Sequence, residues 1–438
     1  WDMMDSQFNY YLRMLRNAEL MTESYWGHKG ACFTEQIENF GLPVAYSYGI
    51  EPRTGMRPRG KQANAYCEYL WDTVMDFCLM MIQTNTYEGR DITPYISFIE
   101  SCLTFFDEHY RMLALQRTVQ PFDRKKHYIF YPGTAGETYK MATNSSQTIA
   151  ALTAVLKELI SLPDQYISKE KKAHWQEMLS HMPPLPFRMM EGHKVIAPAQ
   201  SFERLMNVEI NQLYPVFPYD MYGLGRPDLE VARDTWRYGI DQPKWQKNRH
   251  ESWHQDAIFC ARLGLLTEAR DLVWRKLQNG RHRFPAFFGP GHDWTPDHNW
   301  GGTGMIALQE MLMQNVGDSI LILPCWPKEW NVSFKLHAPK QTTVECTYNN
   351  GKIETLSVFP ESRRKDIIIA LNGFATADTL KTVRSQTIND DWEFAFGNET
   401  AEHISLPHTW NNKDAQEYSP NPKAPKGAPT YKPGKGVY

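Results

Sequence analysis

The sequence lacks several features that would each indicate a class of protein. It has no run of about 18 apolar residues, so no membrane-spanning helix is predicted. Its 47 Lys and Arg against 50 Asp and Glu leave no basic excess to neutralise nucleic-acid phosphates. The seven cysteines form no Cys-x-x-Cys pair, and their number is odd. We therefore expect no membrane, no nucleic acid, no disulfide framework and no cysteine metal site.

Alternating strand patterns are almost absent from residues 1–317, where helical spacing of apolar residues dominates. No 34-residue repeat is present, which excludes a tetratricopeptide solenoid. Long loops rich in Gly, Trp and His separate the helices, and such loops commonly form a pocket at one end of a helical body. We predict helices at roughly 6–21, 62–83, 93–113, 145–162, 168–181, 226–237, 252–263, 266–277 and 302–315.

The pattern changes near residue 318. Residues 318–375 contain β-branched, alternating stretches with an Asn-Asn-Gly turn, which predicts a small β-sandwich. Residues 376–438 are predicted to be a linker followed by the opening strands of a further β domain. That segment ends in a polar tail rich in Pro, Gly and Lys, which cannot complete a sheet. Because the chain begins at Trp1 without Met, we expect it to be a piece of a longer protein.

Two carboxylates about 160 residues apart are the candidate catalytic groups. Glu137 is the single acid of "YPGTAGETYK", and Asp297 precedes the Gly-Gly turn of "PDHNWGGTG". The alternatives are that Glu137 packs in an ordinary loop and that Asp297 only orders its turn. Aromatic residues, 13% of the chain, stack well on sugar rings, although large cores also contain many of them.

The segment "DHNWGGTGMIALQEMLMQN", followed by "ILILPCWPKEW", resembles the C-terminal part of (α/α)6-barrel glycoside hydrolases, family 95 α-L-fucosidases in particular. Residues 254–277 are similar to the preceding helix pair of that family. The resemblance, over about residues 1–345, implies an (α/α)6 barrel without a cofactor or metal. It also implies that Glu137 is the general acid and Asp297 a member of the water-activating group. Inverting cleavage needs these carboxyls roughly 6.5–9.5 Å apart.

The water-holding asparagines of family 95 are only partly matched. Their counterpart here is "WDMMDSQFNYY", in which Asp5 and Asn9 are the candidates and only the Asn-Tyr pair clearly persists. The sugar, anomer and linkage therefore stay open. Further candidates for substrate binding, each with a purely structural alternative, are Trp26, His28, Glu35, Trp253, His254, His298, Asn299 and Trp300.

Residues 250–254, "HESWH", match the His-Glu-x-x-His pattern of zinc proteases. A metalloprotease would need both histidines on one helix and a third ligand. We expect His250 in a loop and His254 at the start of a helix, so the two would not share a face. A zinc site is therefore not predicted.

The tail "INDDWEFAFGN…ISLPHTWNNKDAQEY" resembles the first strands of the sugar-binding domain of family 2 glycoside hydrolases. That resemblance implies a multimodular, bacterial, periplasmic or secreted protein of polysaccharide degradation. The predicted function is an inverting, exo-acting glycoside hydrolase on a plant or algal oligosaccharide. The alternative is a non-catalytic carbohydrate-binding or scaffolding remnant. The oligomeric state stays open.

Overall fold

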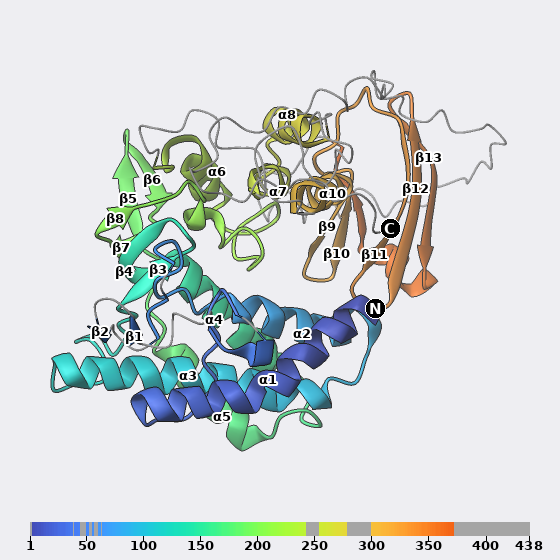
Figure 1. Cartoon of the computed structure of the whole chain (residues 1–438). Coiled ribbons are helices and arrows are strands. Elements are labelled where there is room, and N and C mark those ends of the chain that lie inside the picture. The colour runs from blue at the N-terminus through green and yellow to red at the C-terminus, as the bar shows by residue number, and fades with distance from the viewer. Residues whose placement is uncertain are drawn as a thin grey trace, which may run out of the picture.

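The computed structural model describes residues 2–37, 39–43, 50–51, 55–56, 60–62, 64–241, 254–277 and 299–371. In this part the chain is mainly helical, as predicted, and also has several small sheets (Figure 1). None of its helices combines the length and the apolar character of a membrane span. The predicted linker and tail, residues 376–438, lie outside the described residues.

Five helices form the first part of the fold and lie together in the lower half of Figure 1. Helix α1 packs on α3, α2 packs on both α3 and α4, and α4 packs on α5. Local signals set their ends: Ser145 caps α4 by accepting from the Thr148 backbone N–H at 3.0 Å, and left-handed Gly89 ends α2. The bounds are α1 Asp2–Trp26, α2 Val74–Glu88, α3 Thr93–Arg117, α4 Ser146–Ser161 and α5 Lys169–Ser180.

These helices share one cluster of buried side chains, which we call the N-terminal core: it runs from Phe8 to Met178 and includes Tyr219. Aromatic rings dominate one end of it. Phe105 contacts Trp26, Trp71 and His109, with ring centroids 4.8–5.8 Å apart. Such offset and edge-on contacts add stability beyond the burial of area.

Short strands flank the helices and were not predicted. Strand β4 pairs with β3, β7 and β8, and β5 forms a separate hairpin with β6. With two to seven residues each, they are too short for a clear alternation of apolar and polar residues. The bounds are β3 Gly133–Ala135, β4 Tyr139–Ser145, β5 Phe187–Met190, β6 His193–Ile196, β7 Ala199–Ser201 and β8 Arg204–Leu205; β1 Ile50–Glu51 pairs with β2 Gly55–Met56, and η1 spans Asn39–Gly41.

The second part of the fold has its own cluster, the C-terminal core, from Ile210 to Ala370. Helix α10 packs on α7 and α8, next to two three-stranded sheets, β14-β10-β9 and β11-β12-β13. The buried side chains of both sheets belong to this core. The bounds are η3 Asn211–Leu213, α6 Leu229–Tyr238, α7 Asp256–Arg262, α8 Leu266–Lys276, α10 Asn299–Leu312, β9 Met313–Val316, β10 Ser319–Ile322, β11 Val332–Ala338, β12 Thr342–Asn349, β13 Lys352–Phe359, η4 Glu361–Asp366 and β14 Ile367–Ile369.

Two predicted boundaries differ from the structure. Residues 64–69 and 72–73 form turns and bends, and α2 begins only at Val74. Helix α10 ends at Leu312, and β9 then pairs with β10 across a turn at Gly317, whose φ is +57°. The sheet therefore begins before residue 318, because a glycine that adopts a positive φ closes a hairpin there.

The turn between β11 and β12 joins the two parts of the fold. The backbone N–H groups of Lys340 and Gln341 donate to the carbonyls of Thr86 and Tyr87, both at 2.7 Å. The side-chain amide of Gln341 donates to the Glu88 carbonyl at 2.8 Å. These three carbonyls belong to the last turn of α2, where intrahelical donors run out.

Candidate functional site

Glu137 occupies the tight turn between β3 and β4. Its backbone N–H donates to Glu209 Oε2 at 2.7 Å, and Asn207 Nδ2 donates to Glu137 Oε2 at 3.1 Å. Gly136 before it has φ +49°, a conformation that glycine adopts without strain. The Glu137 side chain is half-buried. The carboxylate is thus held by specific donors rather than lying in an ordinary surface loop.

Glu35, one of the predicted substrate-binding residues, lies directly beside Glu137. The Cys67 thiol donates to Glu35 Oε2 at 3.0 Å and to Glu137 Oε1 at 3.7 Å. One ligand-type atom of each of the three residues lies within 4.8 Å of the others. We call Glu35, Cys67 and Glu137 the acid cluster. Sequence analysis had placed Cys67 in an apolar helix, whereas the structure puts it in the turns before α2.

Burial shifts the proton equilibria of the acid cluster. It raises the pKa of Glu35, an effect that the Cys67 hydrogen bond opposes and the charge of Glu137 reinforces. Burial also raises the pKa of the Cys67 thiol strongly, with further contributions from both glutamates. A neighbouring carboxylate disfavours ionisation, so burial and the charge of Glu137 both favour the neutral form of Glu35.

A buried cation lies next to the acid cluster. The Lys140 side chain is fully buried, and its ammonium donates to the Tyr66 carbonyl. Burial lowers the pKa of Lys140 to about 8, while the negative charges of Glu209 and Glu137 hold it up. Lys140 is on β4, three residues after Glu137, so the same hairpin brings the acid and the cation to one place.

The acid cluster is also the one set of three described His, Cys, Asp and Glu side chains whose ligand atoms converge closely enough for a metal ion. A thiol must lose its proton to bind a metal well. Here the Cys67 proton is engaged with Glu35, and the thiol pKa is raised. The chemistry of the cluster therefore fits a proton better than a metal ion.

Trp26 and His28 are packed into the aromatic end of the N-terminal core. Trp26 and His109 have ring centroids 4.6 Å apart, and His28 Nε2 hydrogen-bonds to His109 Nδ1 at 2.9 Å. Burial lowers the pKa of both histidines. Trp26 and His28 are half-buried, and their contacts with neighbouring rings explain their positions without a ligand.

Asp5 and Asn9 lie at the opposite end of α1. Asp5 forms an ion pair with Arg90 at 2.9 Å, and Asn9 is exposed. The 21 residues from Asp5 to Trp26, at a rise of 1.5 Å each, separate them by about 30 Å along the helix. One sugar-sized pocket therefore cannot contain both Asp5 and Trp26.

The remaining predicted residues cannot be assembled from the described part of the chain. Asp297, Trp253 and His298 lie outside the described residues, as do His250 and Glu251 of the zinc-type motif. His254 is buried just before α7, and Asn299 is the exposed first residue of α10. Trp300 is in α10, but its side chain is not described. The distance between the carboxyl groups of Glu137 and Asp297 therefore stays a prediction.

Two acids that sequence analysis missed lie at the start of α2: Asp72 is buried and Asp76 is half-buried. Asp72 accepts from Gln147 Nε2 at 3.1 Å and from Thr148 Oγ1 at 2.5 Å. Asp76 accepts from the Tyr219 hydroxyl at 2.5 Å. Burial raises the pKa of Asp72 to about 6 and, together with the Asp72 charge, that of Asp76 to about 7. Their spacing of four residues in an otherwise apolar stretch was the available signal.

No protein-family model matches the chain, and no curated protein matches it in sequence. A solved structure described as "Putative kojibiose phosphorylase from human microbiome" is similar, with a TM-score of 0.51 and 9% sequence identity. The match covers 78% of this chain and 51% of the other, so the chain spans about half the length of the structure it matches. This likeness shows a fold shared with a carbohydrate-active enzyme and does not single out family 95.

Proposed function

We propose that this chain cleaves glycosidic bonds and that Glu137 protonates the leaving oxygen. The observation that carries the proposal is the acid cluster: two glutamates joined by a thiol, with ligand-type atoms within 4.8 Å of one another. The fold shared with a carbohydrate-active enzyme supports the substrate class. General acid catalysis contributes typically 10²–10⁴-fold to such a reaction.

The contacts around Glu137 fix the orientation of its carboxyl group. Asn207 orients one carboxyl oxygen and Cys67 lies against the other. Glu35, which burial favours in its neutral form, supplies a proton to the pair. Because the two carboxyls interact, the proton belongs to the pair rather than to one residue. In the proposal, the proton that the pair holds passes to the leaving oxygen.

The water-activating group of the proposal includes Asp297. Glu35 is too close to Glu137 for that role, because an inverting pair needs roughly 6.5–9.5 Å between its carboxyl groups to admit a water. In the proposal, Asp297 acts from the turn before α10, and the enzyme is inverting and exo-acting on a plant or algal oligosaccharide. The (α/α)6 barrel, the β-sandwich, the further modules and a periplasmic or secreted setting belong to the same proposal, on the sequence resemblances alone.

Phosphorolysis is a second candidate reaction, favoured by the similar solved structure, which is described as a "Putative kojibiose phosphorylase". It requires the same protonation of the leaving oxygen, but inorganic phosphate replaces water as the nucleophile. The two reactions differ in their products: hydrolysis releases a free sugar, whereas phosphorolysis releases a sugar phosphate. Incubating the protein with disaccharides and aryl glycosides, with and without inorganic phosphate, separates them.

The test of the acid is the pair of variants Glu137→Gln and Glu35→Gln, compared with Glu177→Gln, an exposed glutamate of α5. We expect Glu137→Gln to lower kcat/KM about 10²–10⁴-fold and the control to stay within about twofold. Glu35→Gln should shift the alkaline limb of the pH profile, because the pair loses its second carboxyl. Circular dichroism checks the fold of each variant.

A protein that binds glycans of the panel but cleaves none, with or without phosphate, would be the non-catalytic alternative. If the Glu137→Gln variant cleaves glycosides as well as the native protein, the proposed activity stands but Glu137 is not its general acid. Full activity of Asp297→Asn would likewise remove Asp297 from the water-activating group.

A further inference from the structure

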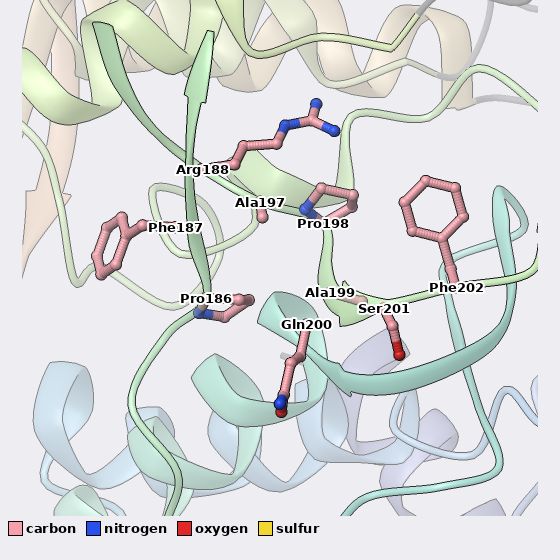
Figure 2. Close-up of a pocket in the computed structure, with 9 residues that line it drawn as sticks. All are labelled: Pro186, Phe187, Arg188, Ala197, Pro198, Ala199, Gln200, Ser201 and Phe202. Carbon is pink, nitrogen blue, oxygen red and sulfur yellow. The ribbon is translucent and has the colours of Figure 1, made fainter.

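A pocket of about 420 Å³ lies beside the β5–β6 hairpin and strand β7 (Figure 2). None of its lining residues belongs to the acid cluster. In the view of Figure 2, Phe187 and Phe202 lie at its two sides, with Pro186 and Pro198 between them. The lining residues are Pro186, Phe187, Arg188, Ala197, Pro198, Ala199, Gln200, Ser201 and Phe202.

We propose that this pocket is a second carbohydrate site that binds a neutral sugar ring against Phe202. The ligand class rests on the proposed function, whereas the site itself rests on the geometry of the pocket. Its volume lies toward the lower end of the range of small-molecule sites, about 300–1,000 Å³. A mono- or disaccharide therefore fits it, and a folded partner does not.

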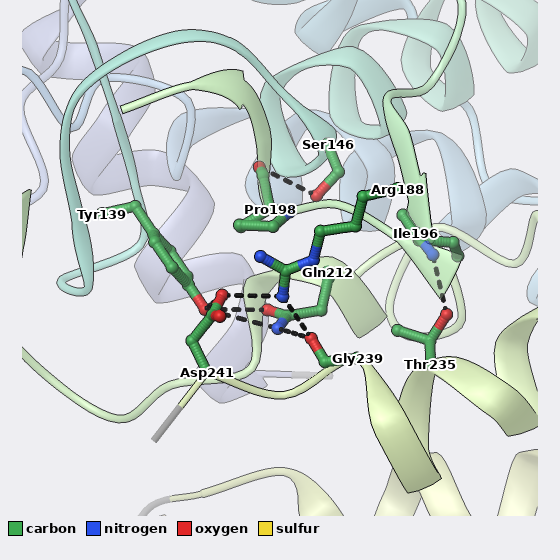
Figure 3. Close-up of polar contacts among 9 residues, drawn as sticks. All are labelled: Tyr139, Ser146, Arg188, Ile196, Pro198, Gln212, Thr235, Gly239 and Asp241. Atoms are coloured by element: carbon green, nitrogen blue, oxygen red, sulfur yellow. Dashed lines mark hydrogen bonds and ion pairs between the residues drawn. The ribbon is translucent and has the colours of Figure 1, made fainter. Parts of the chain in front are cut away.

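The charge of the pocket favours a neutral ligand. Arg188 is its one charged lining residue. The guanidinium donates to Asp241 Oδ2 at 2.8 Å and to the Gly239 carbonyl at 2.7 Å, and the Tyr139 hydroxyl donates to the same Asp241 oxygen at 3.0 Å (Figure 3). The cation is thus neutralised within the wall, so an anion would gain little from it.

The polar contacts for a ligand come from exposed side chains of the pocket rather than from Arg188, whose Nε is buried. The side chains of Gln200 and Ser201 are exposed and can exchange hydrogen bonds with sugar hydroxyls.

The apolar face of the site is best supplied by Phe202. Its ring contacts Tyr139 edge-on, with centroids 4.8 Å apart, and the residue is still 36% exposed. Phe187 is comparably exposed, but the Lys194 ammonium lies 4.2 Å from its ring centroid. One aromatic ring is therefore occupied by a cation, and the other is free to pack on the C–H face of a sugar.

The experiment measures binding without turnover, in protein that carries Glu137→Gln. Glucose, galactose, fucose and a glucose disaccharide are each titrated by calorimetry and by saturation-transfer NMR. We expect Phe202→Ala to weaken one binding event about tenfold. Phe202→Leu keeps an apolar contact with Tyr139 and serves as a second, milder variant. The matched control is Phe359→Ala, an exposed phenylalanine of β13 outside the pocket.

An equal loss of sugar affinity in Phe202→Ala and Phe359→Ala, or no loss in either variant, would overturn the proposed site. So would binding of inorganic phosphate in place of the sugars, since an anion site requires an unpaired cation. The cleavage proposal is judged separately, in protein with native Glu137: Phe202→Ala should leave hydrolysis of a short aryl glycoside within about twofold. Failure of cleavage with retained binding at Phe202 would remove the catalytic proposal and leave this one.

Discussion

The two cores of the molecule handle charge differently. In the N-terminal core and at its edge, no described arginine pairs with Asp72, Asp76 or Glu35, and burial raises the pKa of each. Glu68, by contrast, pairs there with Arg204. In the second part of the fold, acids lie against arginines: half-buried Arg262 lies 2.7 Å from half-buried Asp220, and buried Arg363 pairs with buried Asp366.

The difference shows which part of the molecule is suited to proton chemistry. A paired ion stays ionised over a wide pH range and stabilises one geometry, whereas an unpaired buried acid changes its protonation near neutral pH. Asp72, Asp76 and Glu35 of the first part are therefore groups that can exchange protons. The second part has a core of its own and contacts the first through the β11–β12 turn and α2.

The largest loss of stability should come from truncating a large buried side chain in either core. Phe105→Ala removes a ring at the centre of the aromatic cluster, and Leu321→Ala removes a buried side chain of β10. We expect losses of about 3–5 and about 2–5 kcal/mol in the free energy of unfolding. Urea denaturation followed by circular dichroism measures both. Because the β11–β12 turn binds α2, we expect a single transition; two separate transitions would mean that the cores unfold independently.

A pair of glycines sharpens the comparison. Gly136 in the first part and Gly351 in the second both have a positive φ, at +49° and +82°. A Cβ at Gly136 would overlap the side chains of Asn211 and Glu209, whereas one at Gly351 would meet nothing within 4 Å. We expect about 3 kcal/mol or more for Gly136→Ala and about 1 kcal/mol for Gly351→Ala. Cleavage should fall with the first variant alone, and equal losses of stability would contradict the difference.

The unpaired acids should give the stability a defined pH dependence. Asp76 ionises near 3.8 in the unfolded chain and near 7 in the folded one. Between these values the folded state binds more protons, so its stability is present below pH 4 and falls as the pH rises toward 7. Asp76→Asn should flatten that fall in denaturation curves taken from pH 4 to 8. An unchanged slope would show that the carboxyl has an ordinary pKa.

The smallest effect is expected at an exposed ion pair of the second part. Lys335 and Glu345 lie 2.6 Å apart across β11 and β12, with both side chains more than half exposed. Lys335→Ala should cost less than about 1 kcal/mol, and raising the salt concentration should reduce the difference. A loss comparable to that of Gly136→Ala would mean that charge matters as much in the supporting sheets as packing does at the site.

Most long helices could be predicted because the spacing of their apolar residues is regular over several turns. Residues 93–113 and 145–162 correspond closely to α3 and α4. The short strands could not be predicted, because pairings such as β4 with β7 and β8 depend on residues about 60 positions apart. The turns at residues 64–69 could not be predicted for a similar reason: their buried apolar side chains are covered by neighbouring segments and do not form one face of a helix.

The site was partly accessible from the sequence. Glu137 stood out as a lone acid in an aromatic loop, and Glu35 was already a candidate. Their convergence through Cys67 could not be predicted, since nothing in the local pattern places residues 35, 67 and 137 together. The role of Asp5 in substrate binding stays a prediction, and the length of α1 places it far from Trp26.

The attachment of the β11–β12 turn to α2 has a consequence for biosynthesis. The amide of Gln341 reaches a carbonyl 253 residues earlier in the chain. As the polypeptide leaves the ribosome, α2 emerges long before the segment that completes its last turn. Until then water must donate the hydrogen bonds to those carbonyls, so the last turn of α2 gains its native partners only when the β11–β12 turn has been synthesised.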